Sequence, residues 1–129
     1  MNGTAGDDDM RAGLGADIMY GRGGEDELYG HEGPDVAYGG PDDDYLRADC
    51  DSDYYCGRDE KHGGPGDDVL VGGLLSEKFF GGRGNDWFQD YNSHKNPDTF
   101  RCGPGFDRVY YNKGLDKVAD DCEKVIDWP

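Results

Sequence analysis

Hydrophobic side chains recur at every ninth residue in the first part of the chain, from Met10 to Tyr55. An aspartate stands two residues before each of them, from Asp8 to Asp53. A fixed period of this length is typical of a repeat architecture, in which one unit is too small to bury its apolar residue and stacked units share a core. The pattern therefore predicts a solenoid with one inward side chain per nine residues.

The same period continues to residue 119 with two interruptions. Twelve nine-residue units occupy 3–56, 63–89 and 93–119, in groups of six, three and three. Between these groups we expect short insertions at 57–62 and 90–92, and after them a C-terminal cap at 120–129. Because consecutive units would share one core, the chain 1–129 is predicted to be a single domain.

The eighth place of each unit is the predicted inward position. It holds Met10, Met19, Leu28, Ala37, Leu46, Tyr55, Leu70, Phe79, Phe88, Phe100, Val109 and Val118. All twelve are hydrophobic, although hydrophobic residues make up only 34% of the chain, so composition alone does not produce the pattern. The sixth place is aspartate in eleven units and Glu77 in the other.

The local chemistry of a unit predicts a turn followed by a short strand. The unit at 63–71 reads GGPGDDVLV, with glycine at places one, two and four. Glycine permits positive φ and close backbone approach, so this segment is a turn that few other residues could follow. In the last three places, one side chain faces inward and its two neighbours face outward. The predicted fold class is therefore all-β.

The unit resembles the nonapeptide of the calcium-binding repeats-in-toxin (RTX) family, GGxGxDxUx, where U is a large apolar residue. The units GGPGDDVLV (63–71) and GGRGNDWFQ (81–89) match it at every defined place. The resemblance covers 3–89 well and 93–119 loosely. It implies a parallel β-roll, which is a flattened β-helix solenoid with two units per coil and turns alternating between two edges. It also implies Ca²⁺ between successive turns of one edge.

In such a roll, aspartates eighteen residues apart would stack at about 4.8 Å, the distance between neighbouring strands. Two carboxylates at that distance repel by roughly 1 kcal/mol in bulk water and by several at a protein surface. Carboxylate and carbonyl oxygens suit a hard divalent ion with flexible geometry, so the row predicts calcium. We expect about five ions along the glycine-rich edge. The expected ligands there are Asp8, Asp26, Asp44, Asp68, Asp86 and Asp107.

The other edge is poorer in glycine and contains histidines and lysines. One or two ions are expected on it, around Asp17, Asp35 and Asp53. At Glu77, Asp98 and Asp116 the sequence favours turns held by hydrogen bonds without an ion.

An alternative calcium site has the spacing of an EF-hand loop. Asp49, Asp51, Asp53 and Glu60 stand at the first, third, fifth and twelfth places of such a loop. Tyr54 occupies the place that the loop reserves for glycine, and no helical pattern flanks the segment. A degenerate repeat is therefore the favoured interpretation.

The composition is strongly acidic, with a net charge of −16 and 23 glycines in 129 residues. Low hydrophobicity with high charge is typical of disordered chains, so folding is expected to require calcium. The acidity argues against nucleic acid and anionic membranes as partners, and no run is apolar enough for membrane insertion. His31, His62 and His94 lie in turns or insertions without a nucleophile motif, so we do not expect an enzyme.

Four cysteines allow three pairings, and their spacing does not match a zinc site. An even count favours two disulfides and an oxidising compartment, with free buried thiols as the alternative. Cys102 and Cys122 could face each other on adjacent coils, and a Cys50–Cys56 bond would close the first insertion. Typical RTX proteins are poor in cysteine, so the chain looks more like the cysteine-bearing, secreted RTX-like proteins of other bacteria.

Outward residues of the strands after the glycine-poor edge would form an apolar stripe. Its members are Ile18, Tyr20, Val36, Tyr38, Tyr54 and Phe80. An exposed apolar patch often marks an interface, so self-association or ligand binding is one interpretation, and cover by the first insertion or the tail is the other. Adhesion and ice binding are variants of the first interpretation. Ice binding through a threonine ladder is disfavoured, because the chain has only Thr4 and Thr99.

Overall fold

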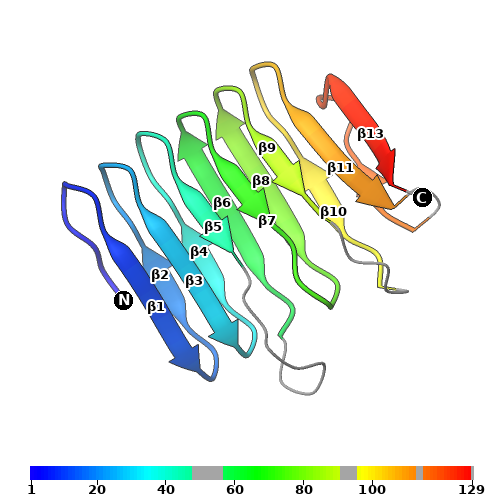
Figure 1. The fold of residues 1–129 in the computed structure, drawn as a ribbon. Coiled ribbons are helices and arrows are strands. Elements are labelled where there is room, and N and C mark those ends of the chain that lie inside the picture. The colour runs from blue at the N-terminus through cyan, green and yellow to red at the C-terminus, as the bar shows by residue number, and fades with distance from the viewer. Residues whose placement is uncertain (48–56, 91–95, 113–114, 129) are drawn as a thin grey trace.

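The computed structural model describes residues 1–47, 57–90, 96–112 and 115–128. Within these ranges the chain forms thirteen strands and no helix, and every strand pair is parallel. Figure 1 shows the strands stacked in chain order from the N-terminal end of the solenoid to the C-terminal end. The prediction of an all-β parallel β-roll is confirmed. No helix in the described part of the chain is long and apolar enough to span a membrane.

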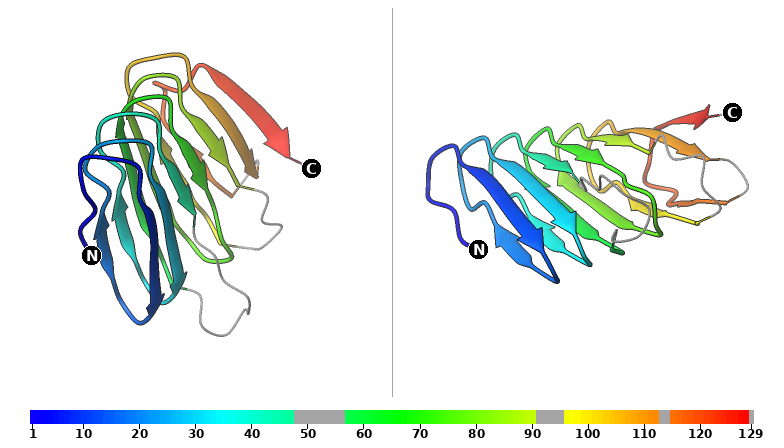
Figure 2. Two further views of the ribbon diagram at one scale, coloured as in Figure 1. Left: turned by 60° about the vertical axis from the view of Figure 1, so that its left-hand side comes forward. Right: turned by 60° about the horizontal axis from the view of Figure 1, so that its bottom comes forward.

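Two sheets face each other across a narrow core (Figure 2). The seven-stranded sheet contains β1 (Asp9–Leu14), β3 (Glu27–Glu32), β5 (Tyr45–Arg47), β7 (Val69–Val71), β9 (Trp87–Gln89), β11 (Arg108–Asn112) and β13 (Lys124–Trp128). The six-stranded sheet contains β2 (Ile18–Tyr20), β4 (Val36–Tyr38), β6 (Glu60–Pro65), β8 (Lys78–Arg83), β10 (Thr99–Arg101) and β12 (Lys117–Val118). Successive strands alternate between the sheets, so two nonapeptides make one coil.

The strand register gives the number of residues per coil. Leu28 pairs with Leu46, a step of 18 residues, whereas Leu46 pairs with Leu70, a step of 24. Phe88 pairs with Val109, a step of 21. The longer steps contain six and three residues more than the regular coil, which is the total length of the two predicted insertions.

The core is a single column of inward side chains. Ten of the twelve predicted inward residues are at most 6% exposed. In the C-terminal half, aromatic rings fill this column: Phe79 stacks on Phe100 with centroids 4.7 Å apart, and Phe88 meets Phe79 edge-on at 6.2 Å. Val118 is partly buried against the same column. The hydrophobic period therefore identified the core correctly at these positions.

The predicted position of the first insertion, 57–62, is wrong. Glu60, Lys61 and His62 belong to β6, where Lys61 pairs with Ala37 on one side and Phe79 on the other. Lys61 therefore takes the inward place that we expected for Tyr55, which lies outside the described residues. The hydrophobic period could not show this, because a charged residue breaks the pattern and Tyr55 offered an apolar match.

The C-terminal segment is a further strand of the roll. β13 pairs with β11, with Val125 opposite Val109, and it ends the seven-stranded sheet within the segment 120–129 that we expected to cap the roll. Val125 remains 41% exposed on this last coil. The predicted disulfide between Cys102 and Cys122 is present, with the two Cα atoms 5.2 Å apart. Cys50 and Cys56 lie outside the described residues.

Candidate metal centre

The turns that precede the odd-numbered strands form one edge of the roll, here called the first edge. Along it, the amide of each sixth-place aspartate donates to a carboxylate oxygen of the next coil, 18 to 24 residues later. The pairs are Asp8 to Asp26 (2.9 Å), Asp26 to Asp44 (2.9 Å), Asp44 to Asp68 (2.8 Å), Asp68 to Asp86 (2.9 Å) and Asp86 to Asp107 (2.7 Å). Glu123, in the predicted cap, accepts from the amide of Asp107 at 2.9 Å and completes the row. One oxygen of each carboxylate thus joins neighbouring coils.

The second oxygen of these carboxylates is the chemically important one. Among the described residues, buried Oδ2 atoms that accept no hydrogen bond belong to Asp26, Asp44, Asp68, Asp86 and Asp107 on this edge. A buried anionic oxygen without a partner is costly. The same cost repeated on successive coils indicates that the edge is built for a cation. Asp8 differs, because its Oδ2 accepts the amide of Thr4 at 2.6 Å in the first turn.

Glycine at the first place of the turn leaves room beside this oxygen. A Cβ on Gly21 would lie 2.2 Å from Oδ2 of Asp26 and 2.5 Å from the carbonyl oxygen of Gly39. Gly63 and Gly81 show the same approach to their own aspartates, at 2.2 and 2.3 Å. Each of these three turns therefore brings a carboxylate oxygen and a carbonyl oxygen to one small space, and such oxygen donors suit Ca²⁺. The absence of a side chain at this place is what keeps the space open.

Burial raises the pKa of five carboxyls in the first-edge row, those of Asp26, Asp44, Asp68, Asp86 and Asp107. The pKa of Asp44 rises to about 7 and that of Asp68 to about 8, mainly through desolvation and further through neighbouring carboxylates. Hydrogen bonds from the backbone oppose the rise without cancelling it. Without a cation, the row therefore favours bound protons near neutral pH, and a divalent ion would compete with those protons for the same oxygens.

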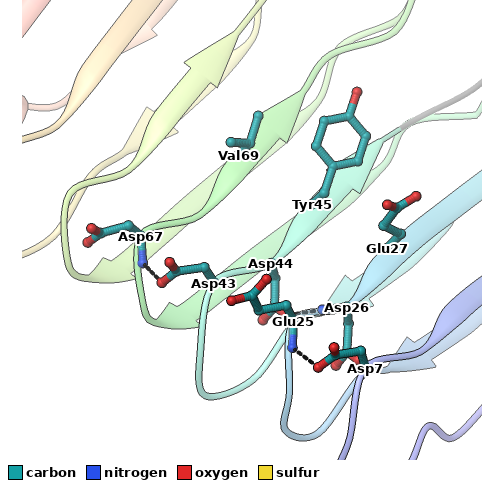
Figure 3. Close-up of a pocket in the computed structure, with 9 residues that line it drawn as sticks. All are labelled: Asp7, Glu25, Asp26, Glu27, Asp43, Asp44, Tyr45, Asp67 and Val69. Atoms are coloured by element: carbon teal, nitrogen blue, oxygen red, sulfur yellow. Dashed lines mark hydrogen bonds between the residues drawn. The ribbon is translucent and has the colours of Figure 1, made fainter.

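A second row of hydrogen bonds, here called the outer ladder, lies outside the aspartate row of the first edge. In it, the amide of a fifth-place residue donates to the preceding coil and not to the next one. The amide of Glu25 donates back to Oδ1 of Asp7 at 2.9 Å, and the amide of Asp67 donates back to Oδ1 of Asp43 at 2.7 Å. The bond recurs from Asn85 to Asp67 at 2.8 Å. Figure 3 shows the fifth-place side chains of Asp7, Glu25, Asp43 and Asp67 along a groove of about 420 Å³. The carboxylates that line it add negative potential next to the buried row, which attracts cations.

This outer ladder was missed from the sequence. Its fifth places hold aspartate, glutamate and asparagine, which resemble ordinary surface residues when each unit is considered alone. Sorting the units by edge shows a signal, because five of the six first-edge units carry one of these residues at the fifth place.

The second edge consists of the turns before the even-numbered strands, and its N-terminal part repeats the first-edge design. The amide of Asp17 donates to Oδ1 of Asp35 at 2.9 Å, and the amide of Asp35 donates to Oδ1 of Asp59 at 2.8 Å. The Oδ2 atoms of Asp17 and Asp35 are buried and accept no hydrogen bond. Asp59 therefore holds the place that we assigned to Asp53, which lies outside the described residues.

The remainder of the second edge is held together differently. Glu77 accepts from the ammonium of Lys61 at 3.2 Å and from the amide of Gly73 at 2.7 Å, so both of its oxygens are used. Further along, carboxylate oxygens of Asp90, Asp98 and Asp116 lie within 4.8 Å of one another. Burial, together with a hydrogen bond to Asp90, raises the pKa of Asp98 to about 9. A proton shared between these two carboxyls would satisfy the cluster near neutral pH without a cation.

The described residues that follow the EF-hand alternative form a strand and not the helix that this motif requires. Glu60, its expected last ligand, lies in β6, and its carboxylate contacts the ring of His62 at 2.7 Å. A β-strand therefore follows the segment where an EF-hand needs a helix. Asp49, Asp51 and Asp53 lie outside the described residues.

A parallel roll whose turns present buried aspartate oxygens and open glycine spaces belongs to the class of calcium-binding β-solenoids. The family model of the RTX calcium-binding nonapeptide repeat (4 copies) matches residues 2–37, 20–55 and 62–75, which together are more than half of the chain. The chain therefore belongs to the RTX calcium-binding repeat family, whose nonapeptides bind Ca²⁺. No curated protein and no solved structure matches the chain.

Proposed function

We propose that this chain is a calcium-binding β-roll module whose folding is coupled to binding about five Ca²⁺ ions along the first edge. The ligands on this edge are Asp8, Asp26, Asp44, Asp68, Asp86 and Asp107. One or two further ions bind on the second edge, around Asp17 and Asp35. The role is structural and does not involve catalysis.

One observation carries the proposal: the buried Oδ2 atoms of Asp26, Asp44, Asp68 and Asp86 accept no hydrogen bond, and each lies where a Cβ on the first-place glycine of its turn would collide with it. Bound calcium would supply positive charge at these oxygens and reduce the net charge of −16 that opposes compaction. Five ions that bind only the folded chain would each contribute about 1.4 kcal/mol at ten times the dissociation constant. Together they would decide whether this small domain folds.

We place the protein outside the cell, where calcium is abundant. Extracellular calcium modules bind at roughly 0.1–1 mM. The Cys102–Cys122 disulfide supports the same compartment, because disulfides persist in oxidising surroundings. Folding would then follow export, since the acidic chain would meet enough calcium only after leaving the cell.

The direct test is a calcium titration of the chelator-treated chain, followed by circular dichroism and isothermal titration calorimetry. We expect β-structure to appear as calcium is added, with five to seven ions bound per molecule. Magnesium at the same ionic strength serves as the control, because it demands a tighter octahedral geometry and retains its water. A chain that is folded in chelator and shows no heat on addition of calcium would overturn the proposal.

The outer face of the six-stranded sheet supports a second role as a surface-interaction module. Ile18 and Tyr20 are 49% and 43% exposed, beside Val36 and Tyr38. Exposed apolar side chains on a flat sheet favour contact with a second copy of the chain. Adhesion to another surface would use the same residues. Ice binding has little support, because Thr99 is the only threonine in this sheet.

The rings on this face form a continuous stack across the coils. Tyr20 stacks on Tyr38 with centroids 5.1 Å apart, Tyr38 on His62 at 4.6 Å, and His62 on Phe80 at 4.5 Å. His62 pairs with Tyr38, whereas Glu60, opposite Val36, takes the place that we expected for Tyr54. Sedimentation of a Tyr20→Ser, Tyr38→Ser variant with calcium tests self-association. An oligomeric state identical to that of the parent chain would exclude this role.

A further inference from the structure

Lys61 is a lysine in the core column of the roll. It is the second residue of β6, is only 2% exposed, and pairs with Ala37 and Phe79 on the neighbouring coils. In the described coils, the other residues at this inward place are hydrophobic. Lysine is almost never fully buried unless it has a partner, so the position requires a specific explanation.

The ammonium of Lys61 is enclosed by two carboxylates and an aromatic ring. Its Nζ lies 3.2 Å from Oε1 of Glu77 and 3.9 Å from Oδ2 of Asp59. It also lies 4.9 Å from the ring centroid of Phe79. The side chains of Asp59 and Glu77 are only 4% and 1% exposed, so the charges meet away from water. Two carboxylates and the face of a ring therefore surround the ammonium at this buried place.

Three departures from the repeat coincide around this lysine. Lys61 is the charged inward residue, and Ala37, opposite it on the preceding coil, is the smallest inward residue. Glu77, on the following coil, replaces the usual aspartate, and its extra methylene lets the carboxylate reach Nζ. Small, cationic and longer acidic side chains on three successive coils therefore fit one another. Because these three departures meet at one point, the ion pair between Lys61 and Glu77 is a specific feature of this coil.

The carboxylates near Lys61 also differ from those elsewhere in the two rows. The Oδ2 atoms of Asp17 and Asp35, earlier on the same edge, are buried and accept no hydrogen bond. At Glu77 both carboxylate oxygens accept hydrogen bonds, one of them from the lysine. The turns of Asp17 and Asp35 therefore need an external cation, whereas at Glu77 the ammonium of Lys61 supplies the positive charge.

We propose that Lys61 is an internal counter-ion that replaces one calcium ion on the second edge, so that the turns of Asp59 and Glu77 are held together without calcium. The inference rests on the proposed calcium function and refines it. Lys61 limits second-edge binding to the coils of Asp17 and Asp35, and it makes the middle of this edge independent of the calcium concentration.

The test compares the parent chain with a Lys61→Met variant, which retains the length and apolar contacts of the side chain but removes its charge. Calcium per folded molecule is measured by equilibrium dialysis, and the calcium midpoint of folding by circular dichroism. We expect the variant to bind one more ion than the parent chain and to need a several-fold higher calcium concentration to fold. Lys78→Met is the matched control, because Lys78 is in the next strand with its side chain 64% exposed and should leave both values unchanged.

A double variant, Lys61→Met with Glu77→Gln, covers the case in which the single variant does not fold. It removes the ammonium together with one of its two anions, so we expect folding with the ion count of the parent chain. A single variant that folds with an unchanged ion count and midpoint would overturn the inference. Failure of both variants to fold at any calcium concentration would also overturn it, because Lys61 would then be required for packing. A parent chain that binds no calcium would instead overturn the proposed function.

Discussion

The amide of Asp26 donates a hydrogen bond to Oδ1 of Asp44, 2.9 Å away on the next coil, while Oδ2 of Asp44 is buried and accepts none. One carboxylate therefore has two separable roles. Its first oxygen holds two coils together, and its second oxygen is available to a metal ion. This division explains why the sixth place requires an acid and why an amide side chain would satisfy only half of the requirement.

Replacing Asp44 by asparagine should separate these roles, because asparagine retains an oxygen that can accept the amide of Asp26 and loses the charge. We expect the variant to fold at high calcium and to bind at least one ion fewer by calorimetry. In chelator it should be less destabilised than the parent chain at pH 8, since it lacks one buried charge. Asp43→Asn is the control: Asp43 is exposed and, among the described residues, accepts the outer-ladder bond from Asp67, so its ion count should not change. Equal losses in both variants would show that general acidity, and not the buried row, binds calcium.

Gly21 and Gly23 belong to the same turn, but we expect alanine to be tolerated at Gly23 and not at Gly21. A Cβ on Gly21 would lie 2.2 Å from Oδ2 of Asp26, whereas a Cβ on Gly23 would meet nothing within 4 Å. We expect Gly21→Ala to lower the stability of the calcium-loaded protein by about 1–3 kcal/mol through overpacking, together with a weaker calcium affinity. Gly23→Ala should change it by less than about 0.5 kcal/mol. Urea denaturation at saturating calcium measures both, and equal effects would argue against a site beside Gly21.

The raised carboxyl pKa values predict how the calcium-free chain responds to pH. The pKa of Asp44 is about 7 and that of Asp68 about 8 in the folded state, against an ordinary value of 3.8. The folded state therefore binds protons more tightly than the unfolded state. The stabilising contribution of these groups is fully present below about pH 4, declines as pH rises, and is lost above pH 7–8.

We therefore expect the chelator-treated chain to gain β-structure when it is acidified from pH 8 to pH 5. At saturating calcium, the far-ultraviolet spectrum should stay constant over the same range until protons displace the ions. Circular dichroism at constant ionic strength records both series. A calcium-free chain that loses structure on acidification would contradict the assignment of these buried carboxyls.

The hydrophobic period predicted the fold well because each inward residue repeats the same physical requirement. Met10, Leu28 and Leu46 are buried at equivalent points of successive coils, so the spacing alone identifies them. The edge assignment of Asp26 and Asp44 followed from alternating the units, and the hydrogen-bonded row agrees with it.

The missed features depend on contacts between coils that no single unit reveals. Lys61 breaks the nine-residue hydrophobic period, and its burial depends on Glu77, sixteen residues later. Glu123 lies in a segment with little resemblance to the repeat, yet its carboxylate ends the first-edge row by accepting from Asp107. Such residues are identified by the partner they meet after folding, and periodicity carries no information about that partner.

The Cys102–Cys122 disulfide is expected to stabilise the last coil independently of calcium. Cys122 is bonded to Cys102, and the carboxylate of Asp121 accepts from the amides of Cys102 at 3.3 Å and Gly103 at 3.0 Å. The sequence separation of 20 closes a loop that contains β11 and β12 and ends just before β13. Because a cross-link restricts the unfolded chain, its removal should cost about 3 kcal/mol.

We expect a Cys102→Ala, Cys122→Ala variant to show this loss in urea denaturation at saturating calcium. Its ion count should fall by no more than the site nearest Asp107, because the earlier coils do not include the cross-link. Reductant added to the double variant controls for the remaining cysteines, Cys50 and Cys56. An unchanged denaturation midpoint would mean that calcium and the hydrogen bonds of Asp121 hold the last coil without the disulfide.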